Sequence, residues 1–512
     1  MTPAPARAAF GPRLAVGLVG ILLAAMVAGL NGRVPALALA DIQGDLGFAR
    51  DDASWLGTAY AAGELAVMPF ATWFAITFSM RRFHLAMLAA AMALSVLMPW
   101  VRELHLLLAL RALHGLCSGA LIPLLMMAAL RFLPPAINLH GLALYALTAT
   151  FSPNVALWLA AACVDRLEDL RWVYWHVVPI GLAAMAMVAW GIPQDPAAPQ
   201  RLRQADWLGL AAGAPGLALA AVALDQGVRL DGFRSPLVTA ATLGAAVFVL
   251  IFAASEWRHP APFIRLQMLG RRNLGLGFGV FVLLLMVCAT AVALPANLLG
   301  PLQGFRIEQS APIGLMVGLP QLALGSAVAQ LLYQRRVDAR HVFAAGLACI
   351  AAGCWLASGI TGEWRVPQFA AAAMLHAIGQ PMAIVPLLFL ATSVVQPVEG
   401  AHVAGIVNTL RAFGALLGGS VIGQLLAVRG RFHHEMLLDR AGRLLARLPW
   451  PPAGPPGLAE TVALQANVLA AADVYRVFGV LALLLIPAVL MLQRMPAPAG
   501  PASSLPSKSV HP

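Results

Sequence analysis

The chain has 512 residues, of which 60% are hydrophobic and only 11% carry a charge, and its mean hydropathy is +0.81. This composition excludes an ordinary water-soluble globular protein, because the surface of such a protein needs a much higher density of charged residues. The formal net charge of +11 does not indicate nucleic-acid binding, because the basic residues follow the membrane topology described below. We therefore predict an all-α integral membrane protein in a lipid bilayer.

The apolar runs predict fourteen membrane-spanning helices, since one crossing of a bilayer needs about 20 mostly apolar residues. An even number of spans places both termini on the same side. The loops on that side carry more Arg residues than the opposite loops, which predicts cytoplasmic termini. The predicted spans are 14–38, 54–79, 83–101, 104–130, 137–163, 172–192, 207–224, 236–255, 274–298, 310–333, 341–360, 368–392, 401–427 and 476–493.

The connections between the spans divide the chain into three parts. Residues 1–192 are predicted to form an N-terminal six-helix bundle, and residues 274–512 a C-terminal six-helix bundle. Residues 193–273 are predicted to be a linker that contains two extra transmembrane helices. This division rests on the Pro-rich polar stretch 191–207, which is typical of a loop and is predicted to link the first bundle to the next part of the chain.

One long connection, residues 429–475, is predicted to lie outside the membrane on the face opposite the termini. Two stretches in it have apolar residues at helical spacing, and the sequence PPAGPPG separates them. This pattern predicts two short helices in a hairpin. Two interpretations remain open, namely a solvated cap over the helix ends and a docking surface for another protein.

Few ionisable side chains fall inside the predicted spans. A charge at the centre of a membrane helix costs about 2.5 to 3.5 kcal/mol on insertion scales, so such a residue normally faces the protein interior or a water-filled cavity. At about 1.5 Å of rise per residue, several of these groups fall roughly 10 to 15 Å below the surface opposite the termini. We expect this shared level to hold a central cavity. The residues at that level are Glu64, Arg111, His114 and His376.

Glu64 is predicted to carry the coupled proton. A low-dielectric site favours the neutral carboxyl, whereas a nearby arginine favours the carboxylate, so the group can take up and release a proton as its surroundings change. The alternative is a fixed ion pair of Glu64 with Arg111 or Arg33 that only orients helices. For His114 and His376 the alternatives are a proton relay and a hydrogen bond between helices.

No motif for enzyme chemistry is present in the sequence. It contains no GxxxxGK[ST], HExxH or GxSxG pattern, and its Cys and His residues show no metal-binding spacing. We therefore predict neither an enzyme nor an ATP-driven pump, and no cofactor or metal. An ion gradient would have to drive any transport.

Three stretches of the sequence resemble motifs of one known family of membrane proteins. LLALRALHGLCSGALIPL (107–124) is similar to the fourth-helix motif of that family, with Arg111 at its arginine. LDQGVRLDGFRSP (224–236) resembles the loop between its two extra helices, and VNTLRAFGALLGGSVIG (407–423) resembles its penultimate helix. By these stretches the chain resembles the 14-span drug:proton antiporters of the major facilitator superfamily, the EmrB-like branch.

The resemblance implies a major facilitator fold with two six-helix bundles and two inserted helices. It further implies multidrug efflux across a bacterial inner membrane, in which protons are exchanged for hydrophobic or amphipathic compounds by alternating access. Arg111 would then assist proton coupling, and Arg81 and Arg82 would belong to the conformational-switch motif. A periplasmic adaptor protein and an outer-membrane channel would be partners, with residues 429–475 as the contact.

The sequence departs from the pattern of that family at several positions. Asn31 stands where the first helix usually has an acid, Arg33 follows two residues later, and His376 stands where an arginine is usual. Because Asn31 is uncharged, we expect Glu64 to be the only carboxylate in the membrane interior. The substrate cavity is predicted from Asn31, Arg33, Glu64 and Arg411.

Two other functions remain open at this point. One is an exporter of fatty or aromatic acids with the same fold, for which Arg33 and Arg111 would be the better ligands. The other is a membrane scaffold that kept the fold and lost coupling.

Overall fold

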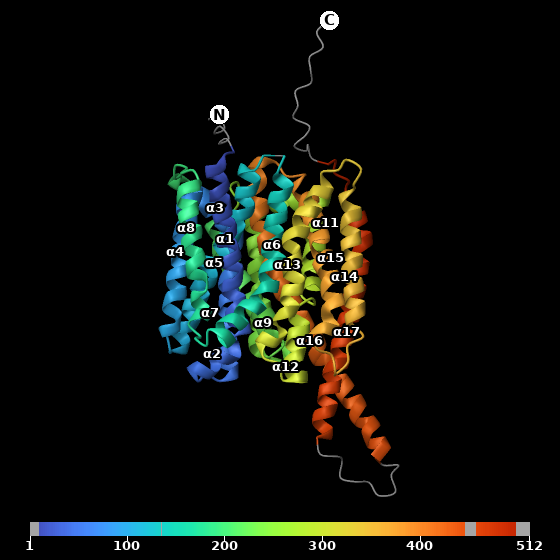
Figure 1. Ribbon diagram of the computed structural model, residues 1–512. Coiled ribbons are helices and arrows are strands. Elements are labelled where there is room, and N and C mark those ends of the chain that lie inside the picture. Colours follow the sequence, from blue (N-terminus) through green and yellow to red (C-terminus); the bar gives the residue numbers. More distant parts are fainter. Residues whose placement is uncertain (1–9, 135, 446–456, 498–512) are drawn as a thin grey trace.

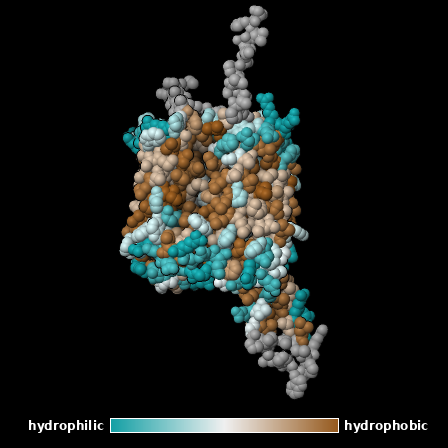
Figure 2. All heavy atoms as spheres, viewed as in Figure 1, coloured by the Kyte–Doolittle hydropathy of each residue, from teal (hydrophilic) through white to brown (hydrophobic). Residues whose placement is uncertain are grey.

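The computed structural model describes residues 10–134, 136–445 and 457–497 of the chain. In these ranges every regular element is a helix, and fourteen helical segments are long and apolar enough to cross a membrane. Figure 2 shows a band of hydrophobic side chains across the middle of the face in view, with hydrophilic side chains gathered above and below it. The all-α prediction and the fourteen predicted spans are therefore confirmed.

The two ends of the molecule are named here by their helices. The terminal face is the one at which α1 begins and α17 ends, and the far face is the one at which α2, α7 and α12 lie (Figure 1). The N-terminal set of helices comprises α1 (Pro12–Leu37), α2 (Leu39–Leu46), α3 (Arg50–Phe78), α4 (Met80–Leu97), α5 (Leu104–Phe132), α6 (Asn138–Ala161), α7 (Trp172–Trp175) and α8 (Val177–Gly191).

The predicted inserted pair is formed by α9 (Trp207–Gly227) and α10 (Pro236–Arg258). These helices pack on each other, and α9 also packs along α3 and contacts α16. The remaining helices are α11 (Arg272–Cys288), α12 (Ala293–Gln303), α13 (Ile307–Leu332), α14 (Ala339–Ala357), α15 (Val366–Thr392), α16 (Gly400–Leu445) and α17 (Leu458–Leu490).

Two predicted spans are interrupted, and a proline follows each interruption. The run 274–298 divides into α11 and α12 because Pro295 has no N–H, and its ring would clash with the carbonyl of Ala291 in a continuous helix. In the same way Pro179 separates the single turn of α7 from α8. The hydropathy of the sequence shows the spans but not these breaks.

The sequence predicts two separate short helices in the long connection 429–475, and the structure differs from this prediction. α16 continues without a break for 46 residues and α17 for 33 residues, so the described parts of the connection extend these two helices beyond the far face (Figure 1). A single glycine such as Gly430 lowers helix stability by only about 1 kcal/mol relative to Ala. This cost is too small to end α16. Asp473 of α17 accepts hydrogen bonds from Arg429 at 2.7 Å and from His433 at 2.8 Å, and thereby joins the two helices. The sequence PPAGPPG lies largely outside the described residues.

α3 and α5 approach each other closely because glycines line their contact. A Cβ atom on Gly63 would lie 2.0 Å from the carbonyl oxygen of Ala112, and one on Gly115 would lie 2.0 Å from that of Tyr60. A Cβ atom on Gly119 would lie 2.7 Å from the carbonyl oxygen of Glu64. Small residues of this kind allow membrane helices to pack backbone against backbone. The position of Glu64 is therefore set by rigid packing of α3 on α5.

Hydrogen bonds join the N-terminal and C-terminal helices on the side of the cavity nearer the terminal face. Thr72 of α3 donates to the carbonyl of Ala401 at 3.0 Å, and Tyr145 of α6 donates to the side chain of Asn408 at 2.9 Å. The hydroxyl of Tyr333 accepts a hydrogen bond from the backbone N–H of Leu139 at 3.2 Å. These contacts close the space between the two sets of helices at this end.

Candidate functional site

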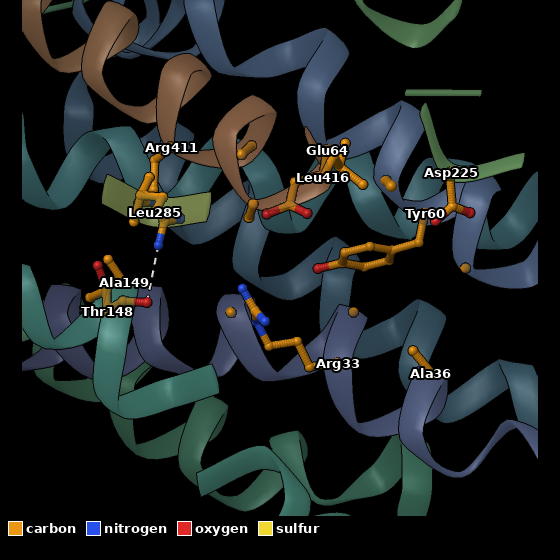
Figure 3. A pocket seen from close by; sticks show the side chains of 16 residues that line it. Arg33, Ala36, Tyr60, Glu64, Thr148, Ala149, Asp225, Leu285, Arg411 and Leu416 are labelled. Atoms are coloured by element: carbon orange, nitrogen blue, oxygen red, sulfur yellow. Dashed lines mark hydrogen bonds between the residues drawn. The ribbon is translucent and has the colours of Figure 1, made fainter. Parts of the chain in front are cut away.

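A polar cavity of about 240 Å³ lies between α1, α3, α6, α9, α11 and α16. Figure 3 shows the labelled charged side chains that project into it. Two guanidinium groups and two carboxylates from four different helices are among its walls: Arg33, Arg411, Glu64 and Asp225. We call this space the charged chamber.

A second cavity of about 380 Å³ adjoins the charged chamber, and we call it the apolar chamber. Arg33, Ala36, Ala149, Leu285 and Ala415 line both spaces, so these side chains stand between the two. The further walls of the apolar chamber are mostly hydrophobic and include Leu37, Pro153, Leu157, Val292, Ile422 and Leu426. The combined site thus has a charged end and an apolar end.

Glu64 reaches the charged chamber because of its register on α3. Gly57, Tyr60, Ala61 and Glu64 recur at intervals of three and four residues, so they occupy one face of the helix, and all four line the chamber. The Glu64 side chain is half-buried. Among the described residues no basic nitrogen lies within 4.0 Å of its carboxylate, so the alternative of a fixed ion pair with Arg33 or Arg111 is not observed.

The two arginines of the chamber differ in their surroundings. Arg33 of α1 is solvent-accessible although helices surround it, because its side chain lies in the cavity, and it forms no hydrogen bond with a described residue. Arg411 of α16 is buried, with an exposed fraction of 8%, and donates one hydrogen bond to the carbonyl of Thr148 at 3.0 Å. Its Nε has no partner among the described residues. Both guanidinium groups therefore keep free donors.

Asp225 was not expected in the cavity, and its presence corrects the prediction that Glu64 is the only carboxylate in the membrane interior. The hydropathy of the run 207–224 falls at this acid, but α9 continues to Gly227 and carries Asp225 to the wall of the charged chamber. Thr58 of α3 donates a hydrogen bond to its carboxylate. Gly227, which is the last residue of α9, is the signal in the sequence that could have extended this helix.

Asn31 is not a wall of either chamber, contrary to its prediction as a cavity residue. Residues 29, 32, 33 and 36 of α1 face the cavity, and this register turns Asn31 toward α5 instead. There it is 3% exposed and donates a hydrogen bond to the hydroxyl of Ser118 at 2.9 Å. Its structural function is to join α1 to α5.

Arg111 and His114 lie behind the cavity wall rather than in it. The Arg111 guanidinium donates to the carbonyls of Asn31 and Leu56 at 3.3 and 3.4 Å, and it stacks over the ring of Tyr60 at 4.6 Å. His114 contacts Arg111 at 3.4 Å through Nδ1, with its Nε2 3.2 Å from the hydroxyl of Ser95. Arg111 thus supports Tyr60, which is a cavity residue one helical turn before Glu64.

His376 and the arginine pair Arg81 and Arg82 are also remote from the cavity. His376 of α15 is 2% exposed, and its Nε2 lies 3.8 Å from the sulfur of Cys354 on α14. Arg81 and Arg82 begin α4 at the terminal face, where they form no ion pair with a described residue. The expectation that Glu64, Arg111, His114 and His376 share one cavity is therefore wrong, because equal depth does not make residues face the same space.

The cavity lies on the far-face side of the hydrogen bonds that join the two sets of helices. Its walls come from the second half of α1, the first half of α3 and the end of α9, all of which are near the far face. Toward the terminal face, the contacts of Thr72 and Tyr145 described above join the two sets of helices. At the far face, Arg306 pairs with Asp165 and Arg166 pairs with Glu308, so ion pairs join the two sets at that end as well.

Comparisons with known proteins agree with this architecture. The family model described as "Major Facilitator Superfamily" matches residues 21–307. The probable multidrug resistance protein EmrY of Escherichia coli is 22% identical, with 85% of this chain and 84% of that protein covered. The fatty acid resistance protein FarB of Neisseria gonorrhoeae is 23% identical, with 84% of each chain covered.

Solved structures of transporters share the fold. The human organic anion transporter MFSD10 superposes with a TM-score of 0.59 at 14% identity, over 94% of this chain and 100% of that one. The proton:xylose symporter XylE superposes with a TM-score of 0.55 at 12% identity, over 95% and 97% of the two chains. The chain is therefore a transporter and not an enzyme, and it belongs to the Major Facilitator Superfamily.

Proposed function

We propose that this transporter exports hydrophobic or amphipathic compounds in exchange for protons, which bind at Glu64. The observation that carries the proposal is a carboxylate that pairs with no basic group among the described residues and lies in a cavity that water can enter. Ionisable residues at membrane depth are costly and mark proton and substrate pathways. The names of several relatives, among them multidrug, fatty acid and puromycin resistance proteins, support export as the direction of transport.

The shape of the site suits amphipathic molecules. A polar group in the charged chamber would find arginine and carboxylate side chains, while an attached hydrophobic group would displace water from the apolar chamber. Ligand sites with mostly apolar walls and a few placed polar groups bind by this combination. The apolar walls contain many aliphatic side chains and impose no single shape, which favours a range of substrates.

Alternating access would open the terminal face and close the far face. Residues 1–192 and 274–512 would move as two halves about the central site, with residues 193–273 carried along by α9 on α3. Opening requires the hydrogen bonds of Thr72 and Tyr145 across the halves to break.

Coupling follows if substrate and proton compete for the same acid. A cationic group of the substrate is held by ionised Glu64 and is released when Glu64 is protonated, so the two cannot occupy the site together. By linkage, substrate binding lowers the proton affinity of Glu64 to the same degree as a proton weakens substrate binding. An inward proton gradient then drives substrate outward.

The projecting ends of α16 and α17 are proposed as the contact for a periplasmic adaptor protein that leads to an outer-membrane channel. Exposed Phe432 and Leu438 on α16 offer apolar anchors beyond the far face. A variant with Phe432→Ser and Leu438→Ser should retain transport in proteoliposomes and lose resistance in cells. Unchanged resistance in cells would exclude the adaptor contact.

The function is tested by susceptibility profiling of a strain that lacks the gene. We expect the wild-type gene to restore resistance to amphipathic compounds and Glu64→Gln to fail at equal protein level. The matched control is Glu363→Gln, because Glu363 is exposed in the loop between α14 and α15. Equal resistance from Glu64→Gln and wild type would reject Glu64 as the coupling site.

A further inference from the structure

The charged chamber holds charges of both signs that do not neutralise one another by contact. Arg33 and Arg411 supply two positive charges, and ionised Glu64 and Asp225 supply two negative charges, so the sum is zero. Among the described residues, no guanidinium nitrogen of either arginine lies within 4.0 Å of either carboxylate. Charges at membrane depth are normally paired or solvated. The arrangement therefore leaves both signs available to a bound molecule.

The positive groups have free donors in suitable geometry for an anion. Arg33 extends into the cavity without a hydrogen bond to a described residue, and Arg411 uses one donor on the carbonyl of Thr148. The Nε of the largely buried Arg411 has no partner among the described residues. A guanidinium group presents a planar fork of donors that matches a carboxylate or phosphate.

The negative groups lie on two helices that pack together. Glu64 belongs to α3 and Asp225 to α9, and Thr58 of α3 links them by its hydrogen bond to Asp225. Thr58 also accepts a hydrogen bond from Gln226, which holds the end of α9 in place. In Figure 3 Tyr60 lies between Glu64 and Asp225, and Arg33 lies across the chamber from them. The acids thus form one wall, and Arg33 belongs to another.

We propose that the preferred substrates carry a zwitterionic head group and an apolar tail. The cationic part of the head lies against Glu64 and Asp225, the anionic part pairs with Arg33 and Arg411, and the tail enters the apolar chamber. A purely cationic head group would lie near the two arginines, and a purely anionic one near the two acids. In either case like charges face each other without a partner, which weakens binding. This inference rests on the proposed function and adds the charge of the substrate to it.

The assignment makes Asp225 a second acid with a function different from that of Glu64. Asp225 recognises the cationic group, with its carboxylate held in place by the hydrogen bond from Thr58, whereas Glu64 exchanges the proton. The inserted pair α9 and α10 would then contribute directly to substrate selection. Loss of Asp225 would change which head groups bind and leave the pH dependence of binding in place.

A series of probes with one tail and four head groups tests the inference. The full chain in lipid nanodiscs is titrated with decyl betaine, decyltrimethylammonium, decanoate and decyl maltoside, each below its micelle concentration. We expect decyl betaine to bind about tenfold more tightly than either singly charged probe, which corresponds to about 1.4 kcal/mol. Decyl maltoside, with a neutral head, should bind most weakly.

Two variants separate the two walls. Asp225→Asn should weaken the binding of decyl betaine and of decyltrimethylammonium by about tenfold, and leave the binding of decanoate unchanged or tighter. Arg33→Gln should instead weaken the binding of decyl betaine and of decanoate. Unchanged binding of decyl maltoside and an unchanged unfolding temperature show that each variant is folded. Glu363→Gln serves as the control for a charge outside the cavity.

Some outcomes overturn the inference without touching the proposed function. If decyl betaine binds no more tightly than a singly charged probe, or all four heads bind alike, the zwitterion assignment is wrong. Proton-coupled transport of any amphipathic probe that is abolished by Glu64→Gln would still support the proposed function. Conversely, selective decyl betaine binding without proton movement would reject proton coupling and keep the head-group assignment.

Discussion

Thr58 on α3 donates a hydrogen bond to the carboxylate of Asp225 on α9. The bond joins the helix that carries Glu64 to the inserted helix pair, at the wall of the charged chamber. Gln226 donates to the same hydroxyl and accepts a hydrogen bond from Arg229, which pairs with Asp51 at the start of α3. The inserted pair is thus connected to the site by a chain of polar contacts and is not a separate layer.

The Thr58 hydrogen bond is expected to contribute measurably to stability. Thr58→Val keeps the shape of the side chain and removes the donor to Asp225, which should cost about 1 kcal/mol of unfolding free energy. The matched control is Thr242→Val on α10, because among the described residues that hydroxyl bonds only to the Val238 carbonyl of its own helix. Thermal unfolding in detergent compares the two, and equal midpoints would show that the contact between α3 and α9 is weak.

Gly115 is expected to be intolerant of any side chain. In Gly115→Ala the new methyl group would meet the carbonyl oxygen of Tyr60 at 2.0 Å, so α3 must move away from α5. Such overpacking typically costs about 1 to 3 kcal/mol, and it displaces Tyr60 and Glu64 from the cavity wall. Gly279→Ala is the control, because nothing lies within 4 Å of a Cβ atom there. The idea fails if both variants unfold at the wild-type temperature and transport equally.

The ion pair of Arg271 with Glu399 is expected to make stability depend on pH. Both residues lie outside the spans, and two hydrogen bonds of 2.7 Å from Arg271 hold the pKa of Glu399 below its usual value. A depressed carboxyl pKa adds stability above the pKa of the unfolded state, and this stability is lost as the pH falls through the folded pKa. Glu399→Gln should therefore destabilise the protein by about 1 to 2 kcal/mol at neutral pH, since Arg271 is partly solvated.

The same substitution should have little effect in acid. Unfolding curves of wild type and Glu399→Gln, recorded from neutral pH to below about 4, should converge as Glu399 takes up a proton in the wild type. A difference between the two proteins that stays constant over this range would show that the pair contributes through packing and not through charge.

Much of the fold can be predicted from the sequence, because lipid demands about 20 apolar residues per crossing and leaves a strong pattern. The boundaries are less accessible. Pro295 divides one predicted span into α11 and α12. α16 continues past Gly430, because one glycine does not end a helix. Both outcomes depend on local backbone contacts that hydropathy does not measure.

The candidate site is predictable only in part. Glu64, Arg33 and Arg411 stand out because charges are rare in apolar runs, and all three do line one cavity. Asn31 does not, because neighbouring residues of a helix point about 100° apart and only the register decides which one faces the cavity. Asp225 was missed because the end of α9 lies beyond the apolar run. The depth of a residue in the membrane can be predicted from the sequence, whereas the direction in which its side chain points depends on how the helices pack.

Proton movement in proteoliposomes tests the coupling site most directly. Vesicles that contain wild-type protein or Glu363→Gln are loaded with an amphipathic substrate and a pH-sensitive dye. As substrate leaves, protons should enter in exchange and acidify the lumen. Glu64→Gln, at equal incorporation, should leave the dye signal flat. Proton flux through Glu64→Gln at the wild-type rate would contradict a mechanism in which this acid carries the proton.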